Sequence, residues 1–169
     1  MSKIKIQALS GRSLAIAQYA LFLSLALAIP LFHSQYVTGP LVNAVLFLAA
    51  ALSGSIGVFF IAMVPSVIAL SAGLLPIVLA PAVPFIMLGN AILVAVFIML
   101  GKKNFWLAMI SASFAKFIFL FGSSQIVVGL IAKKQAAAAA ASMLNYPQLI
   151  TALAGGAIAW AVLKKLKRI

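Results

Sequence analysis

Charged residues divide this chain into long apolar stretches. The first stretch, 13–32, follows a basic leader and ends before the polar segment 33–36. An α-helix rises about 1.5 Å per residue, so roughly 20 apolar residues cross the hydrocarbon layer of a bilayer. We therefore predict a membrane-spanning helix over 13–32. A cleaved signal peptide, with its cleavage site at 26–28, is the alternative, but the apolar core of such a peptide is usually about 7–15 residues long.

No charged residue occurs from Thr38 to Gly101. Breaks rich in glycine and proline at 54–57 and 73–84 divide this segment into three predicted spans. They cover 40–53, 57–72 and 82–100, and the first two are short. Short or interrupted spans are tolerated where their backbone is buried in protein or lines a cavity. Pro65 lies inside the second of these spans and is expected to kink it.

The rest of the chain predicts two more spans. Lys102 and Lys103 end the fourth span, and the fifth covers 105–132. A run of six alanines, 136–141, predicts a short helix outside the bilayer core. The sixth span, 148–163, ends in a basic cluster. The pattern thus predicts an all-α polytopic membrane protein, with a single transmembrane domain over 1–169 and six helices, some short or kinked.

The distribution of positive charge predicts the orientation. With six spans, both termini lie on one side of the membrane, together with nine cations, whereas the other side carries Lys133 and Lys134. Cytoplasmic segments are enriched in Lys and Arg, which predicts an integral protein of the cytoplasmic membrane with both termini in the cytoplasm. A five-span arrangement would separate the two terminal clusters, and the charge count disfavours it. The nine cations are Lys3, Lys5, Arg12, Lys102, Lys103, Lys164, Lys165, Lys167 and Arg168.

Composition excludes most catalytic chemistry. The chain has 12 Lys and Arg, one His, and no Asp, Glu or Cys. Paired-carboxylate catalysis and hard-cation sites therefore lack ligands, as do zinc–thiolate and iron–sulfur sites. The cations sit at the ends of spans and not on a soluble basic face, so nucleic acid is not an expected partner. We expect no enzyme, no metal site and no cofactor.

Lys116 is the cation predicted to lie within a span, near the bilayer centre. An ionised lysine there costs roughly 2.5–3.5 kcal/mol on insertion scales, and such residues usually mark functional sites. Its usual partner, a carboxylate side chain, is missing from this sequence. The counter-charge is then expected from carbonyls, amides or hydroxyls, another subunit or an anionic solute. A neutral amine, or a lysine that only packs against carbonyls or extends along its stem, is the structural alternative.

Other polar residues are predicted to share a pocket with this lysine. Asn90 is placed at about the same depth, Asn43 and Gln148 near the outer mouth, and Ser113 one turn away on the same helix face. Hydrogen bonding between helices is the alternative role for each asparagine. Thr151 also lies near the mouth, and Tyr36, Asn145 and Tyr146 are candidates for a lid.

Small side chains recur every three or four residues on the first span, as a strip formed by Ser13, Ala17, Ala20 and Ser24. Such strips let helices approach closely. For the first span we keep both an outside partner and packing within the chain as hypotheses. The sixth span repeats the device over 152–159, and there we expect packing within the chain.

The chain resembles the substrate-binding S components of energy-coupling factor (ECF) transporters. The shared features are the six short spans, the small-residue strip and Gly39-Pro40 at the start of the second span. The resemblance covers nearly the whole chain and implies an S-component-like bundle that binds a vitamin or similar solute toward the outer side. It implies a transmembrane T component with two ATPases as partners. The family's Ala-xxx-Ala docking motif is replaced here by Ser13-Leu-Ala-Ile-Ala17 or Ala20-Leu-Phe-Leu-Ser24.

The chain also looks like small membrane proteins that carry the label "iron hydrogenase". A hydrogenase site of that kind needs thiolate ligands, and a chain without Cys excludes that activity. The similar segments are 39–44, 65–70, 84–90 and 153–156.

Together these observations predict a non-catalytic subunit that binds a small solute between the second, fourth, fifth and sixth spans. Lys116 would face an anionic or carbonyl group, and uptake would need a separate ATP-hydrolysing module because the chain has no phosphate-binding loop. The alternative is a structural or assembly subunit in which Lys116 is buried against a partner's carboxylate. A passive pore is disfavoured because the polar groups are isolated.

Overall fold

The computed structural model describes residues 11–32, 34–53, 56–73 and 75–169, and in these ranges every regular element is helical. This confirms the predicted all-α polytopic membrane protein. The elements are α1 (Gly11–Ala28), η1 (Ile29–Phe32), α2 (Gln35–Ser53), α3 (Gly57–Ser71), η2 (Ile77–Ala82), α4 (Val83–Gly101), α5 (Phe105–Leu130), α6 (Lys134–Met143) and α7 (Tyr146–Lys165).

Within the described residues, five helical segments are long and apolar enough to cross a membrane, and α3 is a shorter apolar helix. The alanine run forms α6, as expected, and it leads directly into α7. The five segments are Ser13–Phe32, Tyr36–Ser53, Ile77–Gly101, Phe105–Leu130 and Lys134–Lys165.

The start of the second span is the main correction to the predicted boundaries. Helix α2 begins at Gln35, five residues before the predicted start at Pro40. Proline removes the hydrogen bond from its own nitrogen to the carbonyl four residues earlier. Here that carbonyl belongs to Tyr36, in the first turn of α2, so the loss of one bond near the helix start does not prevent the helix from continuing.

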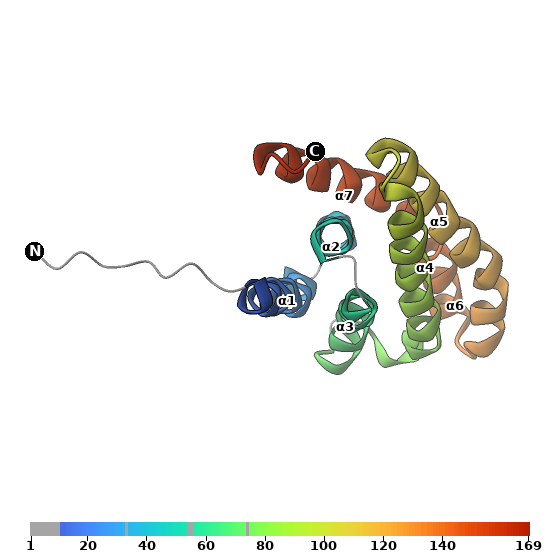
Figure 1. Cartoon of the computed structure of the whole chain (residues 1–169). Helices are drawn as coiled ribbons and strands as arrows, with labels where there is room; N and C mark the ends of the chain where they lie inside the picture. The colour runs from blue at the N-terminus through green and yellow to red at the C-terminus, as the bar shows by residue number, and fades with distance from the viewer. Residues whose placement is uncertain (1–10, 33, 54–55, 74) are drawn as a thin grey trace, which may run out of the picture.

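The helices form two groups that meet along α4 and α5 (Figure 1). In one group, α2 packs on α7, α1 and α3, and α1 lies at the edge of the molecule. In the other, α5 lies beside α4, and α6 packs on α5. Asparagine side chains cap the starts of α5 and α7. The side chain of Asn104 accepts a hydrogen bond from Leu107 N, and that of Asn145 accepts one from Tyr146 N.

Two apolar clusters fill the interior. One contains Phe47 of α2, Leu93 of α4 and Met109 of α5, and the other contains Leu120 of α5 and Leu144. Along α5 the boundary between the clusters falls between Ala112 and Leu120, and along α4 between Val83 and Leu93. A layer of buried polar side chains occupies this boundary.

Glycine allows the backbones of α2 and α7 to touch. A Cβ atom on Gly155 would lie 2.6 Å from the carbonyl oxygen of Pro40 and 2.7 Å from Cβ of Asn43. On the opposite helix, a Cβ on Gly39 would lie 2.7 Å from Cγ2 of Thr151. The small residues at 152, 155, 156 and 159 are all buried, which confirms packing within the chain for the last span.

This contact predicts that Gly155→Ala destabilises the fold. The added methyl group meets backbone atoms of α2, which cannot move aside as a flexible side chain would, and overpacking of this kind typically costs about 1–3 kcal/mol. We expect a lower midpoint of thermal unfolding for the detergent-purified variant. Gly122→Ala in α5 is the matched control, because nothing lies within 4 Å of the added Cβ. Equal midpoints for the two variants would contradict the close contact.

Candidate functional site

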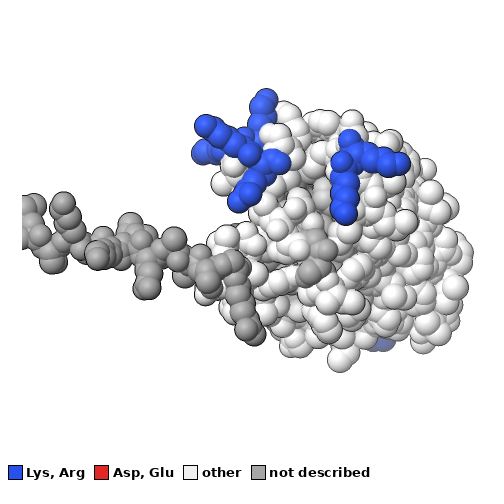
Figure 2. Space-filling view, in the orientation of Figure 1, with Lys and Arg blue, Asp and Glu red and all other residues white. Residues whose placement is uncertain are grey.

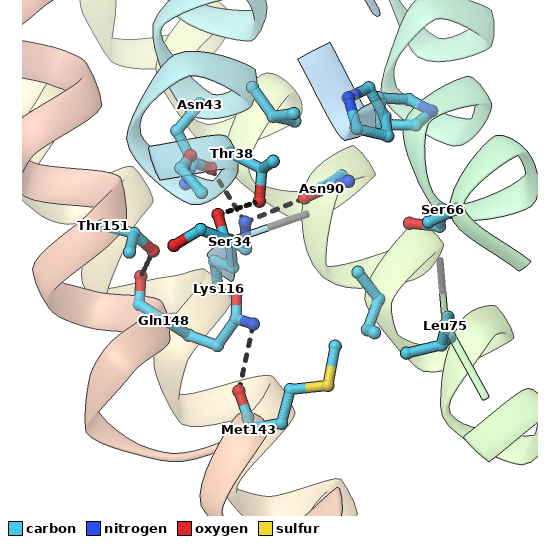
Figure 3. A pocket seen from close by; sticks show the side chains of 16 residues that line it. Ser34, Thr38, Asn43, Ser66, Leu75, Asn90, Lys116, Met143, Gln148 and Thr151 are labelled. Atoms are coloured by element: carbon cyan, nitrogen blue, oxygen red, sulfur yellow. Dashed lines mark hydrogen bonds between the residues drawn. The ribbon is translucent and has the colours of Figure 1, made fainter. Parts of the chain in front are cut away.

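The amine of Lys116 lies at the centre of the buried polar layer. Lys116 projects from the middle of α5 and is 2% exposed. Its Nζ donates hydrogen bonds to Oδ1 of Asn43 and to Oδ1 of Asn90, both at 2.8 Å (Figure 3). The three residues come from α2, α4 and α5, so one amine joins three helices.

Both asparagine amides are held with their oxygens toward the amine. Nδ2 of Asn43 donates to the carbonyl of Gly39 at 2.8 Å, and Nδ2 of Asn90 donates to the carbonyl of Ala62 at 3.0 Å. An amide turned over would place its NH2 group against the lysine amine, donor against donor, and would leave the backbone carbonyl without this bond. The two acceptors are therefore fixed in place before any ligand arrives.

A proline lies in the part of α3 whose backbone accepts a hydrogen bond from Asn90. Pro65 lies inside α3 and has no amide hydrogen. It removes the helical donor for the carbonyl of Ile61 and disturbs the turn that contains Ala62. The side chain of Asn90 bonds to the Ala62 carbonyl in that turn. The bond from Asn90 to Ala62, close to the proline predicted to kink the span, links α3 to the polar layer.

A partly open cavity of about 180 Å³ borders the amine. An ammonium group has three donors, and hydrogen bonds to two protein acceptors account for two of them. Apolar walls come mainly from α2, α3 and α4. The polar residues that line the cavity are Ser34, Thr38, Asn43, Ser66, Asn90, Lys116, Gln148 and Thr151.

The cavity and most of the cations lie at opposite ends of the helices. Its lining comes from the junction of α1 with α2, the end of α3 and the junction of α6 with α7, and it reaches inward as far as Asn43, Asn90 and Lys116. The basic pairs that follow α4 and end α7 belong to the other end of those helices. Figure 2 shows the lysine and arginine side chains gathered in separate patches on an otherwise uncharged surface.

The predicted site residues are only partly brought together. Gln148 and Thr151 line the cavity; Nε2 of Gln148 donates to the carbonyl of Met143 at 3.1 Å, and Oγ1 of Thr151 donates to that of Gln148 at 3.3 Å. Ser113 is buried, but its hydroxyl donates to the carbonyl of Met109 at 2.8 Å and the residue is not part of the lining.

Asn43 lies deeper than the sequence suggested. We expected it near the outer mouth, but it bonds directly to Lys116. The reason is the earlier start of α2: Asn43 is more than two helical turns from Gln35, whereas a helix beginning at Pro40 would place it in the first turn.

The predicted lid does not form over this cavity. Tyr36 and Tyr146 are strongly exposed, and the ring of Tyr146 stacks on Phe117 at 5.7 Å. Asn145 uses its side chain to begin α7. None of the three residues lines the cavity.

Three polar residues of the lining, Ser34, Thr38 and Ser66, were not among the predicted site residues. Thr38 and Ser66 each lie next to a helix-disturbing proline or glycine within an apolar span, which is the signal that could have found them. Thr38 donates its hydroxyl to the carbonyl of Ser34 at 2.9 Å. The hydroxyl of Ser66 makes no hydrogen bond to any part of the chain that the structure describes, and Figure 3 shows it directed toward the cavity.

Most of the small-residue strip on α1 faces away from the rest of the chain. Ala17, Ala20 and Ser24 are exposed, whereas Ser13 is half-buried. The hydroxyl of Ser24 donates to the carbonyl of Ala20 at 2.8 Å, which leaves the strip apolar and narrow. The opposite side of α1, with Phe22 and Ala26, packs into the core.

The shared amine predicts energetic coupling between Asn90 and Lys116. Asn90→Leu alone leaves a buried amine with one acceptor fewer, and an unsatisfied buried polar group costs about 1–3 kcal/mol. In the Lys116→Met background, Asn90→Leu replaces an amide whose oxygen has already lost its hydrogen bond to the lysine amine. We expect Asn90→Leu to lower the free energy of unfolding less in that background, by about 1 kcal/mol or more. Equal effects in both backgrounds, measured in mixed micelles, would show that the two side chains act independently.

Comparison of this chain with protein-family models, curated proteins and solved structures finds no match. What the site does is therefore inferred from the chemistry of its own residues.

Proposed function

We propose that this chain is a membrane-embedded solute-binding subunit for the uptake of a vitamin or similar small solute. The observation that carries the proposal is the amine of Lys116, which is held by two amide oxygens and borders a cavity. A lysine with a purely structural role would need enough hydrogen-bond acceptors from the protein and no cavity beside its amine. This lysine has two acceptors, and the space beside it can hold a third that comes from a solute.

The missing counter-charge supports a solute with an anionic or carbonyl group. The chain has no Asp or Glu side chain anywhere, so no carboxylate side chain of its own can neutralise an ammonium group at this depth. Charged groups in the membrane interior are costly unless they are paired or face a polar cavity. A solute that brings an oxygen acceptor, above all a charged one, removes part of that cost on binding.

The end of the helices at which the cavity lies supports capture from outside the cell. The excess of cations follows α4 and α7 at the end remote from the cavity, and the positive-inside rule assigns that end to the cytoplasm. Both termini are then cytoplasmic in a protein of the cytoplasmic membrane. A cavity at the other end takes up its solute from the outer side.

Release to the inside requires an energy source outside this chain. The sequence contains no phosphate-binding loop, and the cavity offers no residue for nucleotide hydrolysis, so we assign no enzymatic activity to it. A transmembrane T component with ATPases, as in ECF transporters, would supply the energy. The exposed strip of Ala17, Ala20 and Ser24 on α1 offers a smooth surface for such a partner helix.

The burial of Lys116 disfavours the alternative of a purely structural or assembly subunit. That alternative needs a partner's carboxylate beside the amine, but Lys116 is 2% exposed and is enclosed by α2 and α4. A carboxylate could approach it only through the cavity. A small solute fits that approach better than a rigid partner helix.

The proposal predicts that Lys116→Met abolishes or weakens solute binding in a folded protein. Hydrogen bonds to a charged group are worth about 1.5–3 kcal/mol, so affinity should fall by at least about tenfold. Native mass spectrometry of the detergent-purified chain measures this as the loss of a bound small molecule that the wild-type chain retains.

Lys103→Met is the control, because Lys103 is exposed at the other end of α4 and should not affect the bound molecule. Retention of the solute by the Lys116→Met variant would show that this lysine is structural. A wild-type chain that carries no solute, but forms a stable protein complex that Lys116→Met disrupts, would favour the assembly subunit.

A further inference from the structure

We propose that the solute is a compact aliphatic monocarboxylate, an inference that rests on the proposed solute-binding function and narrows it to one chemical class. Three properties of the cavity support this inference. The Lys116 amine has one N–H donor left after its bonds to the two asparagines. The hydroxyl of Ser66 has no hydrogen-bond partner within the described residues, and the cavity beside both groups is small and has aliphatic walls.

The charge balance favours an anion with one negative charge. Lys116 is the only cation that lines the cavity in the described part of the chain, and two of its donor positions are occupied by Asn43 and Asn90. A carboxylate matches one positive charge with one negative charge. A phosphate dianion would bring a second charge and a third terminal oxygen, for which the lining has no further cation. A cationic solute would meet an amine and no carboxylate side chain.

The hydroxyl of Ser66 suits the second carboxylate oxygen. It projects from α3 toward the cavity and makes no hydrogen bond within the described residues, so its hydrogen is available to a ligand. The hydroxyls of Thr38 and Thr151 already donate to backbone carbonyls, whereas that of Ser34, before the start of α2, is a second hydroxyl of the lining that makes no hydrogen bond within the described residues. A carboxylate would thus find one charged donor on α5 and one neutral donor on α3, on two sides of the same cavity.

The size and walls of the cavity limit the rest of the molecule. Its volume of about 180 Å³ is smaller than the roughly 300–1,000 Å³ of most ligand pockets. The apolar walls contain Val42, Leu75, Ile86 and Met143, together with prolines and an alanine, and among the residues that the structure describes no aromatic side chain lines them. Such walls suit a short saturated chain and provide no stacking surface for a planar ring.

The inference is tested with a series of straight-chain carboxylic acids from acetate to decanoate on the full-length chain in detergent. The readouts are calorimetric affinity and the shift in thermal midpoint. We expect affinity to rise with chain length over the short acids and then to fall sharply when the chain exceeds the cavity. The corresponding primary amides and alkyl phosphates should bind at least about tenfold more weakly than the acids, because they lack the single matched charge.

Two substitutions at Asn90 separate charge from packing. Asn90→Asp provides a carboxylate within the chain beside the amine, so the acids should lose at least about tenfold in affinity. Asn90→Leu removes an acceptor without adding charge, so it should weaken acid binding less than Asn90→Asp does. Ser66→Ala should weaken the acids by a smaller factor. Ser123→Ala is the matched control, since this buried serine of α5 donates to its own helix and lies outside the cavity.

Each result decides a different question. Acid binding that is equal in the wild-type chain and in Asn90→Asp overturns the carboxylate assignment. If the wild-type chain instead retains a neutral or phosphorylated solute that Lys116→Met releases, the solute-binding function stands and only the carboxylate class fails. If it binds neither the acids nor any retained solute, both proposals fail.

Discussion

A lysine amine buried among apolar helices, in a chain that has no acidic side chain, is the constraint around which this structure is arranged. Water and carboxylates normally solvate such an amine, and here two asparagine oxygens take their place. Each asparagine is oriented by a backbone carbonyl, so the solvation of one group depends on α2, α3, α4 and α5 together. The buried amine thereby fixes the relative positions of four helices, which apolar packing alone would specify only weakly.

The helix-disturbing residues serve the same arrangement. Gly155 and Gly39 let α2 and α7 touch along their backbones, and this contact includes Cβ of Asn43. Pro65 lies one turn after Ala62, whose carbonyl accepts from Asn90, and both Pro65 and Ser66 line the cavity. In a soluble protein these residues would mainly end helices. Between apolar helices the glycines bring backbone close to backbone, and the proline lies one turn from a carbonyl that accepts a side-chain hydrogen bond.

The parts of this structure that the sequence predicts are those that depend on local composition. The helices are predicted by the lengths of the apolar stretches and by the positions of Lys102 and Lys103 at the end of one of them. The polar layer is predicted by Lys116, which stands alone as a cation within an apolar span. Which side of a helix faces the interior is harder to predict, because helices that are apolar all round carry a weak directional pattern. Ser113 and Lys116 are one turn apart, yet only Lys116 borders the cavity. The depth of Asn43 depended on where α2 begins, and Pro40 gave a misleading boundary.

The distribution of charge links the cavity to the function. With cations at the far end of α4 and α7 and no acidic side chain in the chain, the protein's side-chain charge is entirely positive. The cations at the far end of α4 and α7 lie well beyond a Debye length of about 8–10 Å from the cavity, so the charge that acts on a solute inside it is that of the cavity itself. In the binding proposed above, Lys116, the one cation that lines the cavity in the described part of the chain, would match one negative charge. In the orientation that the positive-inside rule predicts, we propose that this site captures a singly charged anion from the side of the membrane opposite the basic clusters.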